Sequence, residues 1–290
     1  MNYFSYKVKN KEKEITLKEW LQSFNLAKNK INYLIDNKCI NINNEIVNKR
    51  DYILKENDEI LIDVSNYEQI DYLPLRYNLN IIYEDDYILV VNKPSGVIIY
   101  PENKELSNTM ANYIAYYYTK TNQDKTIRHV HRLDTETSGC LVYAKDVLTH
   151  SYLSNLFENS KVKKEYTTIC YGIIEKSGKI DTPIGRNRHN NLMITTKNGA
   201  NALTLYKPIK HINGNTLLNV EIKTGRTHQI RVHLSSIKHP ILGDKMYGKP
   251  DDVKRVMLHC SHIGFVHPVY KYWVDFYADI PEDLEKIIGE

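Results

Sequence analysis

The stretch LTLYKPIKHINGNTLLNVEIKTG, residues 203–225, constrains the fold of this chain more than any other segment. Two runs rich in apolar residues flank the pair Asn213-Gly214. Such a pair between strand-like runs is a strong short-range signal for a tight turn between antiparallel strands. A second hairpin is indicated by residues 79–94, where two apolar runs flank Glu84-Asp85-Asp86. We therefore expect a largely antiparallel sheet.

Helical patterns lie on either side of these strands. In residues 17–35 the apolar spacing fits two short amphipathic helices that meet near Asn25. Strand-like alternation follows over residues 39–64, interrupted by turn residues. Residues 148–162 and 226–237 are again helical in pattern. The chain is therefore predicted to be a mixed α+β protein.

The chain of 290 residues is long enough for a large domain and a small one. Residues 1–65 form the small unit in this interpretation. Residues 66–79 contain one proline and little periodicity, and are read as a linker. Residues 80–290 are then the catalytic-sized domain.

Composition excludes several classes of protein. A hydrophobic fraction of 42% and a charged fraction of 26% are typical of a soluble globular protein. No apolar run approaches the ~18 residues of a membrane span, and the polar start MNYFSYKVKNKEKE is unlike a secretory signal. A cytoplasmic protein without membrane association is expected. The four cysteines lie far apart with no C-x-x-C, so neither a zinc site nor a disulfide framework is indicated. The net charge of +4 permits nucleic-acid binding without requiring it.

The small unit resembles the αL RNA-binding motif first recognised in a small-subunit ribosomal protein. The resemblance rests on the two helices and on INNEIVNKRDYILKENDEILI, residues 42–62. It implies that basic residues on and near the second helix face RNA. The alternative is a solvated basic surface on an accessory domain. The RNA-facing residues would be Lys28, Lys30, Lys38, Lys49 and Arg50.

The stretch HRLDTETSG, residues 131–139, is the most suggestive chemically. Asp134 follows an apolar residue and precedes hydroxyls and a glycine, just before the apolar run 140–144. An isolated aspartate in such a place is usually a turn or capping residue. The stretch alone leaves open whether Asp134 is a turn residue or a reagent.

Four polar stretches, at residues 129–139, 161–172, 223–248 and 257–268, together resemble the RluA-type pseudouridine synthases. The segments HRLD-x-x-TSG and TGRTHQIRVHL each match over eight or more positions. The resemblance extends over roughly residues 80–281. It implies the fold of that family and the isomerisation of uridine to pseudouridine in structured RNA. It also implies that no cofactor is needed.

The resemblance gives several residues a role. Asp134 becomes the reagent, which either attacks C1′ of the ribose or removes the C2′ proton. A buried carboxylate stays ionised only beside a cation, and the resemblance assigns that place to Arg226. Tyr166 would lie against the target base and could help to deprotonate C5; Ile230 would line its pocket. Arg132 would help to occupy the place that the flipped base leaves. Further substrate contacts are expected from His131, Lys164 and Arg231.

Two other functions fit parts of the sequence. A metallohydrolase could use His129 with His131, or His228 with His233, as ligands. No H-E-x-x-H occurs, however, and the neighbouring residues match a family that uses no metal, so no metal site is predicted. A noncatalytic RNA-binding protein would need Asp134 to be idle, although the whole reagent set is present.

The substrate is expected to be ribosomal RNA, because of the small RNA-binding unit, and specifically that of the large subunit. Transfer RNA is the alternative, and the protein is expected to act as a monomer. The chain departs from the family after NKPSG, where Tyr100 stands in place of the usual histidine before proline. This puts one local contact in doubt, not the reaction.

Overall fold

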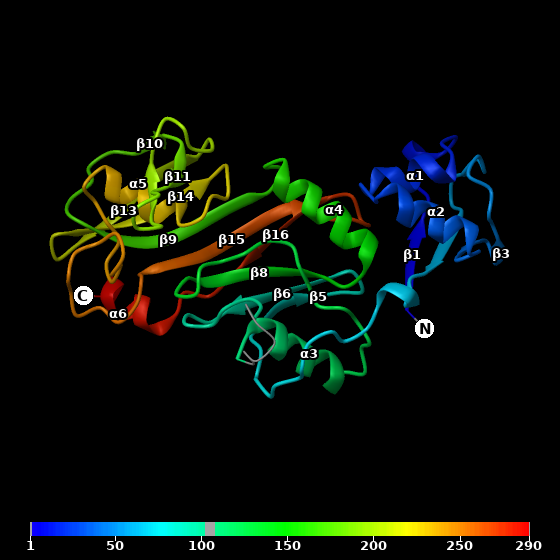
Figure 1. Cartoon of the computed structure of the whole chain (residues 1–290), viewed down its shortest axis with the longest axis horizontal. Helices are drawn as coiled ribbons and strands as arrows, with labels where there is room; N and C mark the ends of the chain where they lie inside the picture. Colours follow the sequence, from blue (N-terminus) through cyan, green and yellow to red (C-terminus); the bar gives the residue numbers. More distant parts are fainter. Residues whose placement is uncertain (1, 102–107, 290) are drawn as a thin grey trace.

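The computed structural model describes residues 2–101 and 108–289. A small N-terminal unit lies at one end of a larger domain built on one long sheet (Figure 1). The predicted α+β class is confirmed. In this described part of the chain, no helix is long and apolar enough to cross a membrane.

The N-terminal unit is a four-stranded sheet, in the order β1-β4-β2-β3, with two helices packed on it. Helix α1 begins at a capping box in which Thr16 and Glu19 satisfy each other's backbone N–H groups. Trp20 and Leu34 are fully buried between the helices and the sheet. The elements are β1 (Tyr3–Lys7), η1 (Asn10–Glu12), α1 (Leu17–Ser23), α2 (Lys28–Asp36), β2 (Ile40–Ile42), β3 (Glu45–Ile46), β4 (Glu59–Asp63) and η2 (Ser65–Tyr67).

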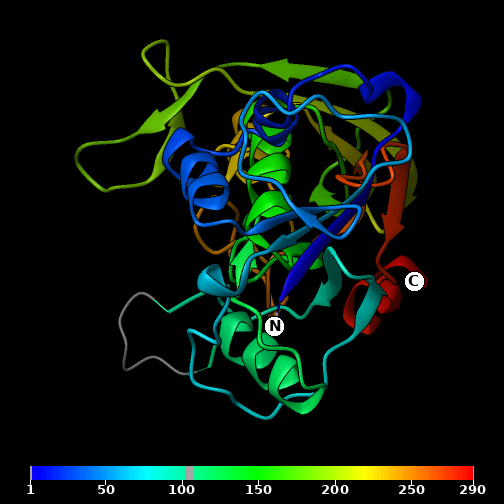
Figure 2. The ribbon, with the colours of Figure 1, turned by 90° about the vertical axis from the view of Figure 1, so that its right-hand side faces the viewer.

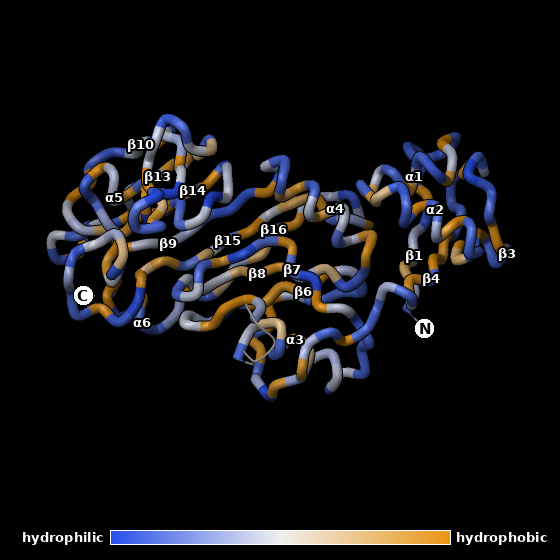
Figure 3. The backbone as a smooth tube through the Cα atoms, in the orientation of Figure 1, coloured by the Kyte–Doolittle hydropathy of each residue, from blue (hydrophilic) through white to orange (hydrophobic). Residues whose placement is uncertain are grey.

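The larger domain is built on a ten-stranded sheet that runs β10-β13-β14-β9-β15-β8-β6-β5, with β16 beside β15 and β7 beside β8. Both predicted hairpins are present, as β5-β6 and β13-β14. Figure 3 shows hydrophobic stretches along the central strands of this sheet. The strands are β5 (Ile81–Glu84), β6 (Ile88–Lys93), β7 (Arg128–His129), β8 (Ser138–Ala144), β9 (Lys163–Tyr171), β10 (Gly178–Asp181), β11 (Ile184–Arg186), β12 (Met193–Thr195), β13 (Leu203–Ile212), β14 (Asn215–Ile222), β15 (Leu258–Val266) and β16 (Trp273–Tyr277).

Four helices accompany the large sheet, and β11 and β12 form a separate two-stranded hairpin. Asp146 caps α4 by accepting hydrogen bonds from two backbone N–H groups of its first turn. Helix α5 lies next to the separate hairpin, at the end of the molecule far from the N-terminal unit (Figure 1). The helices are α3 (Met110–Lys120), α4 (Val147–Glu158), α5 (Gln229–Ser236) and α6 (Glu282–Gly289).

Aromatic side chains join the N-terminal unit to the larger domain. The rings of Phe4 and Tyr87 lie 5.5 Å apart between centroids, and those of Phe24 and Tyr152 lie 6.0 Å apart. The ammonium of Lys271 lies over both Phe24 and Tyr152, at 4.4 and 4.3 Å from the ring centroids. The two units therefore share one continuous hydrophobic core, and Figure 2 shows the N-terminal unit from its outer side.

Strand β8 meets β15 at Gly139 with no room for a side chain. The two strands pair in parallel through Gly139 and Cys260, and Gly139 has a φ of +115°. A Cβ atom at this position would lie 2.2 Å from the carbonyl oxygen of Cys260. This close approach sets where β8 starts, immediately after the turn that carries Asp134.

Gly139→Ala is expected to lower the free energy of unfolding by about 2 kcal/mol or more, because backbone strain and overpacking each cost about 1–3 kcal/mol. Urea denaturation measures the change. Gly214→Ala is the matched control, since Gly214 also has a positive φ, of +78°, but nothing lies within 4 Å of the added atom. Equal losses in the two variants would contradict the argument that close packing of β8 on β15 requires Gly139.

Candidate active site

Asp134 lies on an irregular segment between β7 and β8, and a second segment holds this one in place. The N–H of Gly96 donates to the carbonyl of Thr135 at 2.9 Å. The hydroxyl of Ser95 donates to the carbonyl of Glu136 at 2.7 Å. The two residues that follow Asp134 are thus fixed by the NKPSG segment, which places the carboxylate on a rigid turn.

Lys93 supports the same turn from the interior. Its side chain is fully buried, and its Nζ donates to the carbonyls of Pro94 and Thr135 at 2.8 and 3.0 Å. Burial lowers the pKa of Lys93 to about 7; the nearby Asp134 opposes this shift, and Arg255 adds to it. The ammonium of Lys93 therefore loses its proton more readily than an ordinary lysine does, and it lies close to the carboxylate of Asp134.

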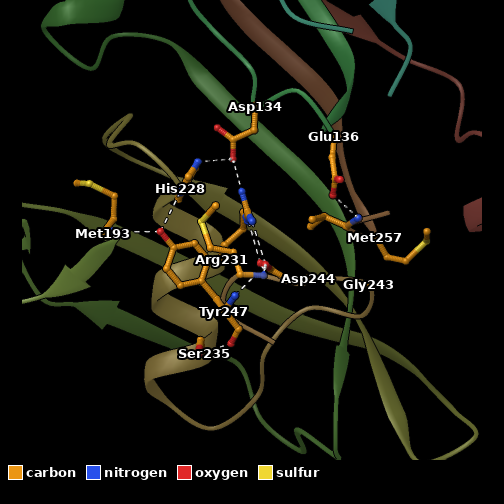
Figure 4. A network of polar contacts seen from close by, with 12 residues as sticks. Asp134, Glu136, Met193, His228, Arg231, Ser235, Gly243, Asp244, Tyr247 and Met257 are labelled. Atoms are coloured by element: carbon orange, nitrogen blue, oxygen red, sulfur yellow. Dashed lines mark hydrogen bonds and ion pairs between the residues drawn. The ribbon is translucent and has the colours of Figure 1, made fainter. Parts of the chain in front are cut away.

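An ion-pair chain connects Asp134 to helix α5 (Figure 4). Nη1 of Arg231 lies 3.4 Å from Oδ2 of Asp134. The same guanidinium donates from Nε and Nη2 to both oxygens of Asp244, at 2.8 and 2.9 Å. Burial disfavours charge on Arg231, but the hydrogen bonds and charges of Asp244 and Asp134 outweigh it and raise the pKa of Arg231.

The buried carboxylate of Asp244 holds the guanidinium of Arg231 in place beside Asp134. The side chain of Asp244 has no exposed surface, whereas that of Asp134 is 28% exposed. Arg231 lowers the pKa of the buried Asp244 in spite of burial, so the pair is ionised. A fixed, bidentate Arg–Asp pair leaves one guanidinium nitrogen directed at the accessible carboxylate of Asp134.

The prediction that Arg226 is the cationic partner of Asp134 is wrong in this structure. The side chain of Arg226 is exposed, and its Nε donates to the carbonyl of Asn201 at 2.9 Å. Arg226 lies in the loop before α5, whereas Arg231 lies in the first turns of that helix and faces inward. Arg226 still lines the cavity described next.

Asp134 lines a central cavity of about 1030 Å³. Tyr166 and Ile230 line it and are almost completely buried, at 6% and 4% exposure. Lys164 also lines it, and burial lowers the pKa of Lys164. Burial together with Cys260 raises the pKa of Tyr166 well above its usual value, so its phenol stays protonated at neutral pH. The cavity thus combines an aromatic ring, an aliphatic side chain and a cation.

Arg132 lies at the rim of the central cavity. It is exposed, and its Nη1 donates to the hydroxyl of Tyr100 at 3.2 Å. The ring of Tyr100 stacks on that of His129, with 4.8 Å between the centroids. The tyrosine that departs from the family pattern therefore holds the arginine expected to replace the flipped base.

The histidines considered as metal ligands each contact other protein groups. Nε2 of His131 accepts a hydrogen bond from the N–H of Val142, and its ring stacks on Phe157. Burial, with Lys164 nearby, lowers the pKa of His131 to about 3, so this cavity-lining ring is neutral. Within residues 2–101 and 108–289, no three His, Cys, Asp or Glu side chains lie close enough to hold a metal ion.

The basic residues predicted to face RNA in the N-terminal unit are mostly accessible. Lys28, Lys38 and Lys49 are exposed, and Arg50 pairs on the surface with Asp36 at 2.6 Å. Lys30 differs from the others, because it is half-buried and lies 5.7 Å from the ring centroid of Tyr67.

Sequence reasoning missed part of the site. Asp244 and Tyr247 were not singled out, and His228 was considered only as a metal ligand. Tyr247 and His228 are hydrogen-bonded to each other next to Asp134 (Figure 4). Asp244, in the stretch ILGDKMYG, could not be recognised as a site residue from its neighbours in the sequence. Its partner Arg231 lies thirteen positions earlier in the chain.

Comparison with known proteins assigns this arrangement to a family. The model of the RNA pseudouridylate synthase family matches residues 87–236. A Bacillus subtilis protein named "Uncharacterized RNA pseudouridine synthase YhcT" is 37% identical over 254 residues, which are 86% of this chain and 83% of that protein. "Ribosomal large subunit pseudouridine synthase D" of Haemophilus ducreyi is 30% identical, over 90% of this chain and 86% of that one.

A solved structure shows the same fold. "Human RNA Pseudouridylate Synthase Domain Containing 1" is 28% identical and superposes with a TM-score of 0.60, covering 70% of this chain and 83% of that one. The family model covers residues 87–236, and the sequence relatives carry the name of the same enzyme class. The protein therefore belongs to the RluA-type RNA pseudouridine synthases, which are isomerases that act on RNA.

Proposed function

We propose that this enzyme converts uridine to pseudouridine in large-subunit ribosomal RNA, with Asp134 as the reagent and without a cofactor. It would do so as a monomer in the cytoplasm. The observation that carries the proposal is the accessible carboxylate of Asp134 in the central cavity, held 3.4 Å from a guanidinium that a buried Asp244 orients. Such preorganised charge is what a reagent carboxylate requires.

The chemistry needs no oxidant or reductant. The bond between N1 and C1′ breaks, the uracil turns, and C5 bonds to C1′; C5 then loses a proton while N1 gains one. Asp134 either attacks C1′ and later leaves, or removes the C2′ proton and later returns it. Both routes use an ionised carboxylate, and both are compatible with the place of Asp134 beside Arg231.

The target base would lie between Tyr166 and Ile230 in the central cavity. Stacking on an aromatic ring contributes ~1–3 kcal/mol per base, which helps to hold a uracil detached from its ribose. Because the pKa of Tyr166 is raised, its phenol would act as a stacking surface and hydrogen-bond donor and would be a poor base for C5. A noncatalytic RNA-binding protein is the less favoured alternative, because it would not require an accessible carboxylate beside a fixed cation in the central cavity.

The choice of ribosomal RNA rests on the name of the Haemophilus ducreyi relative and on the N-terminal unit. Total RNA from a strain that lacks the enzyme is incubated with the protein in buffer containing EDTA, and pseudouridine is then mapped chemically. New pseudouridine in large-subunit RNA is expected. A new site only in transfer RNA would change the substrate, and loss of activity that a transition metal restores would contradict the cofactor-free reaction.

The N-terminal unit would supply affinity for RNA. Replacing the three exposed lysines Lys28, Lys38 and Lys49 by glutamine is expected to weaken binding to structured RNA. The slope of log K against log salt should fall by about 0.7–0.9 for each phosphate contact that is lost. Filter binding at several salt concentrations measures this slope.

Replacing the exposed residues Lys176, Lys179 and Lys197 of the larger domain removes the same net charge and serves as the control. If the two triple variants change the salt slope equally, the N-terminal unit makes no specific contribution to RNA binding.

A further inference from the structure

His228 has a backbone conformation that its residue type disfavours. It immediately precedes α5 with φ 54° and ψ 22°, in the left-handed region. This conformation costs a residue with a Cβ about 1–2 kcal/mol. A residue in this conformation persists where the surrounding structure holds it in place. His228 also lines the central cavity, so its ring faces the proposed chemistry.

The ring of His228 lies between Tyr247 and Asp134 (Figure 4). Its Nδ1 is 2.9 Å from the hydroxyl of Tyr247. Its Nε2 is 3.9 Å from Oδ2 of Asp134, the same oxygen that Arg231 approaches. Two nitrogen donors on different sides of one oxygen can fix the direction of a carboxylate, which one donor alone cannot do.

The hydrogen bonds of Tyr247 determine which nitrogen of His228 carries the proton. The backbone N–H of Met193 donates to the hydroxyl oxygen of Tyr247 at 3.1 Å. The phenolic O–H is then free to donate to Nδ1 of His228, which must be unprotonated to accept it. Burial lowers the pKa of His228, with Arg231 acting in the same direction and Asp134 opposing, so the ring is neutral at pH 7. These contacts favour the tautomer whose single ring proton is on Nε2, which faces Asp134.

Tyr247 is also held by contacts of its backbone and of its ring. Its N–H donates to Oδ1 of Asp244 at 3.0 Å, and its carbonyl accepts from the hydroxyl of Ser235 at 2.8 Å. The guanidinium carbon of Arg231 lies 5.1 Å from its ring centroid. Asp244 thus orients Arg231 directly and His228 through Tyr247, and both of these side chains converge on Asp134.

We propose that His228 is a positioning residue that holds the carboxylate of Asp134 through Nε2–H, in the tautomer that Tyr247 selects. The inference rests on the proposed role of Asp134. The distance of 3.9 Å in the free protein is longer than a hydrogen bond, and it shortens when RNA fills the cavity, since catalytic hydrogen bonds often tighten only in the substrate complex. His228 acts through the carboxylate of Asp134 in this proposal, so its loss should slow the chemical step much more than it weakens RNA binding.

His228→Asn tests the proposal, because asparagine tolerates the left-handed conformation but cannot reach Asp134. The single-turnover rate of pseudouridine formation should fall about 10- to 100-fold, the effect of losing one hydrogen bond to a charged group. The Kd for RNA should stay within about twofold, and the melting temperature should be unchanged or higher. A rate within twofold of the parent, or a rate loss that follows the loss of RNA affinity or stability, overturns the proposal.

The tautomer is read without any reaction. Long-range ¹⁵N–¹H NMR spectra of the labelled histidine rings are recorded for the parent and for Tyr247→Phe. In the parent, His228 should show a proton on Nε2 and an unprotonated Nδ1. In Tyr247→Phe it should show a mixture of tautomers, with a smaller loss of rate than in His228→Asn. A proton on Nδ1 in the parent overturns the proposal.

Matched controls come from outside the central cavity. His239 bonds to the backbone carbonyl of Tyr171, and the hydroxyl of Tyr171 bonds to Asp251. His239→Asn and Tyr171→Phe should leave the single-turnover rate within about twofold. A parent enzyme that forms no pseudouridine in any RNA would count against the proposed function. An active parent with an equally active His228→Asn variant would count against His228 alone.

Discussion

Asp134→Asn should abolish turnover while leaving the protein folded and able to bind RNA. The amide keeps the size of the carboxylate but can neither attack C1′ nor accept the C2′ proton. Removing a nucleophile or base of this kind typically costs ~10⁴-fold or more. Since the turn is held through backbone carbonyls at Thr135 and Glu136, the substitution should not disturb it. Single-turnover pseudouridine formation, RNA filter binding and thermal unfolding measure the three properties.

Glu136→Gln is the matched control for Asp134→Asn. Glu136 lies two residues further along the same turn, also lines the central cavity, and accepts a hydrogen bond from the N–H of Val256 at 3.2 Å. A glutamine oxygen can accept the same bond, so turnover should change less than tenfold. If Asp134→Asn folds normally and still forms pseudouridine near the parental rate, Asp134 is a turn residue and the proposed mechanism fails.

The architecture was predictable where local signals are strong. The Asn213-Gly214 turn and the acidic turn at residues 84–86 both produced antiparallel hairpins. The two helices that meet near Asn25 are also present, as α1 and α2. Each of these features depends on residues close together in the chain, so that turn chemistry and apolar spacing suffice to indicate them.

Other elements left no comparable signal. Helix α3 has buried residues on most of its circumference, including Tyr113 and Tyr118, so it shows no clear polar face. Strand β1 is only five residues long and leads directly into the charged segment at residues 7–14, although Phe4 and Tyr6 are buried. The parallel contact between β8 and β15 joins residues more than a hundred positions apart. Only tertiary packing reveals these features.

The candidate active site was likewise predictable only where it depends on local sequence signals. The motif around Asp134 pointed to a segment that does line the central cavity, but TGRTHQIR contains two arginines, and spacing could not decide which of them lies beside Asp134. The decision depends on where α5 begins: the left-handed turn at His228 leaves Arg226 in an exposed loop and turns Arg231 inward. Asp244 then selects Arg231 across a long loop. The burial of a residue and its contacts with distant segments are properties of the folded chain. Neither could be inferred from the sequence alone.

Arg231→Met should lose both activity and stability. The substitution removes the cation beside Asp134, which should slow the chemical step about 10²- to 10³-fold, as the loss of a preorganised electrostatic group does. It also leaves the carboxylate of Asp244 buried without its partner. Breaking a buried ion pair from one side costs about 3–5 kcal/mol. Chemical denaturation and single-turnover kinetics at saturating enzyme separate the two effects.

The double variant Arg231→Met/Asp244→Asn shows which loss is catalytic. An asparagine oxygen can still accept the backbone N–H groups of Met246 and Tyr247, both 3.0 Å from Oδ1 of Asp244. Stability should therefore largely return, because no buried charge is left unpaired. Turnover should not return, because Asp134 still lacks its cation. Arg226→Met, at the exposed arginine of the same motif, should cost less than tenfold in the chemical step. A double variant that regains both stability and turnover would mean that Arg231 serves only the fold, and a larger loss in Arg226→Met than in the double variant would restore Arg226 as the partner of Asp134 in the RNA complex.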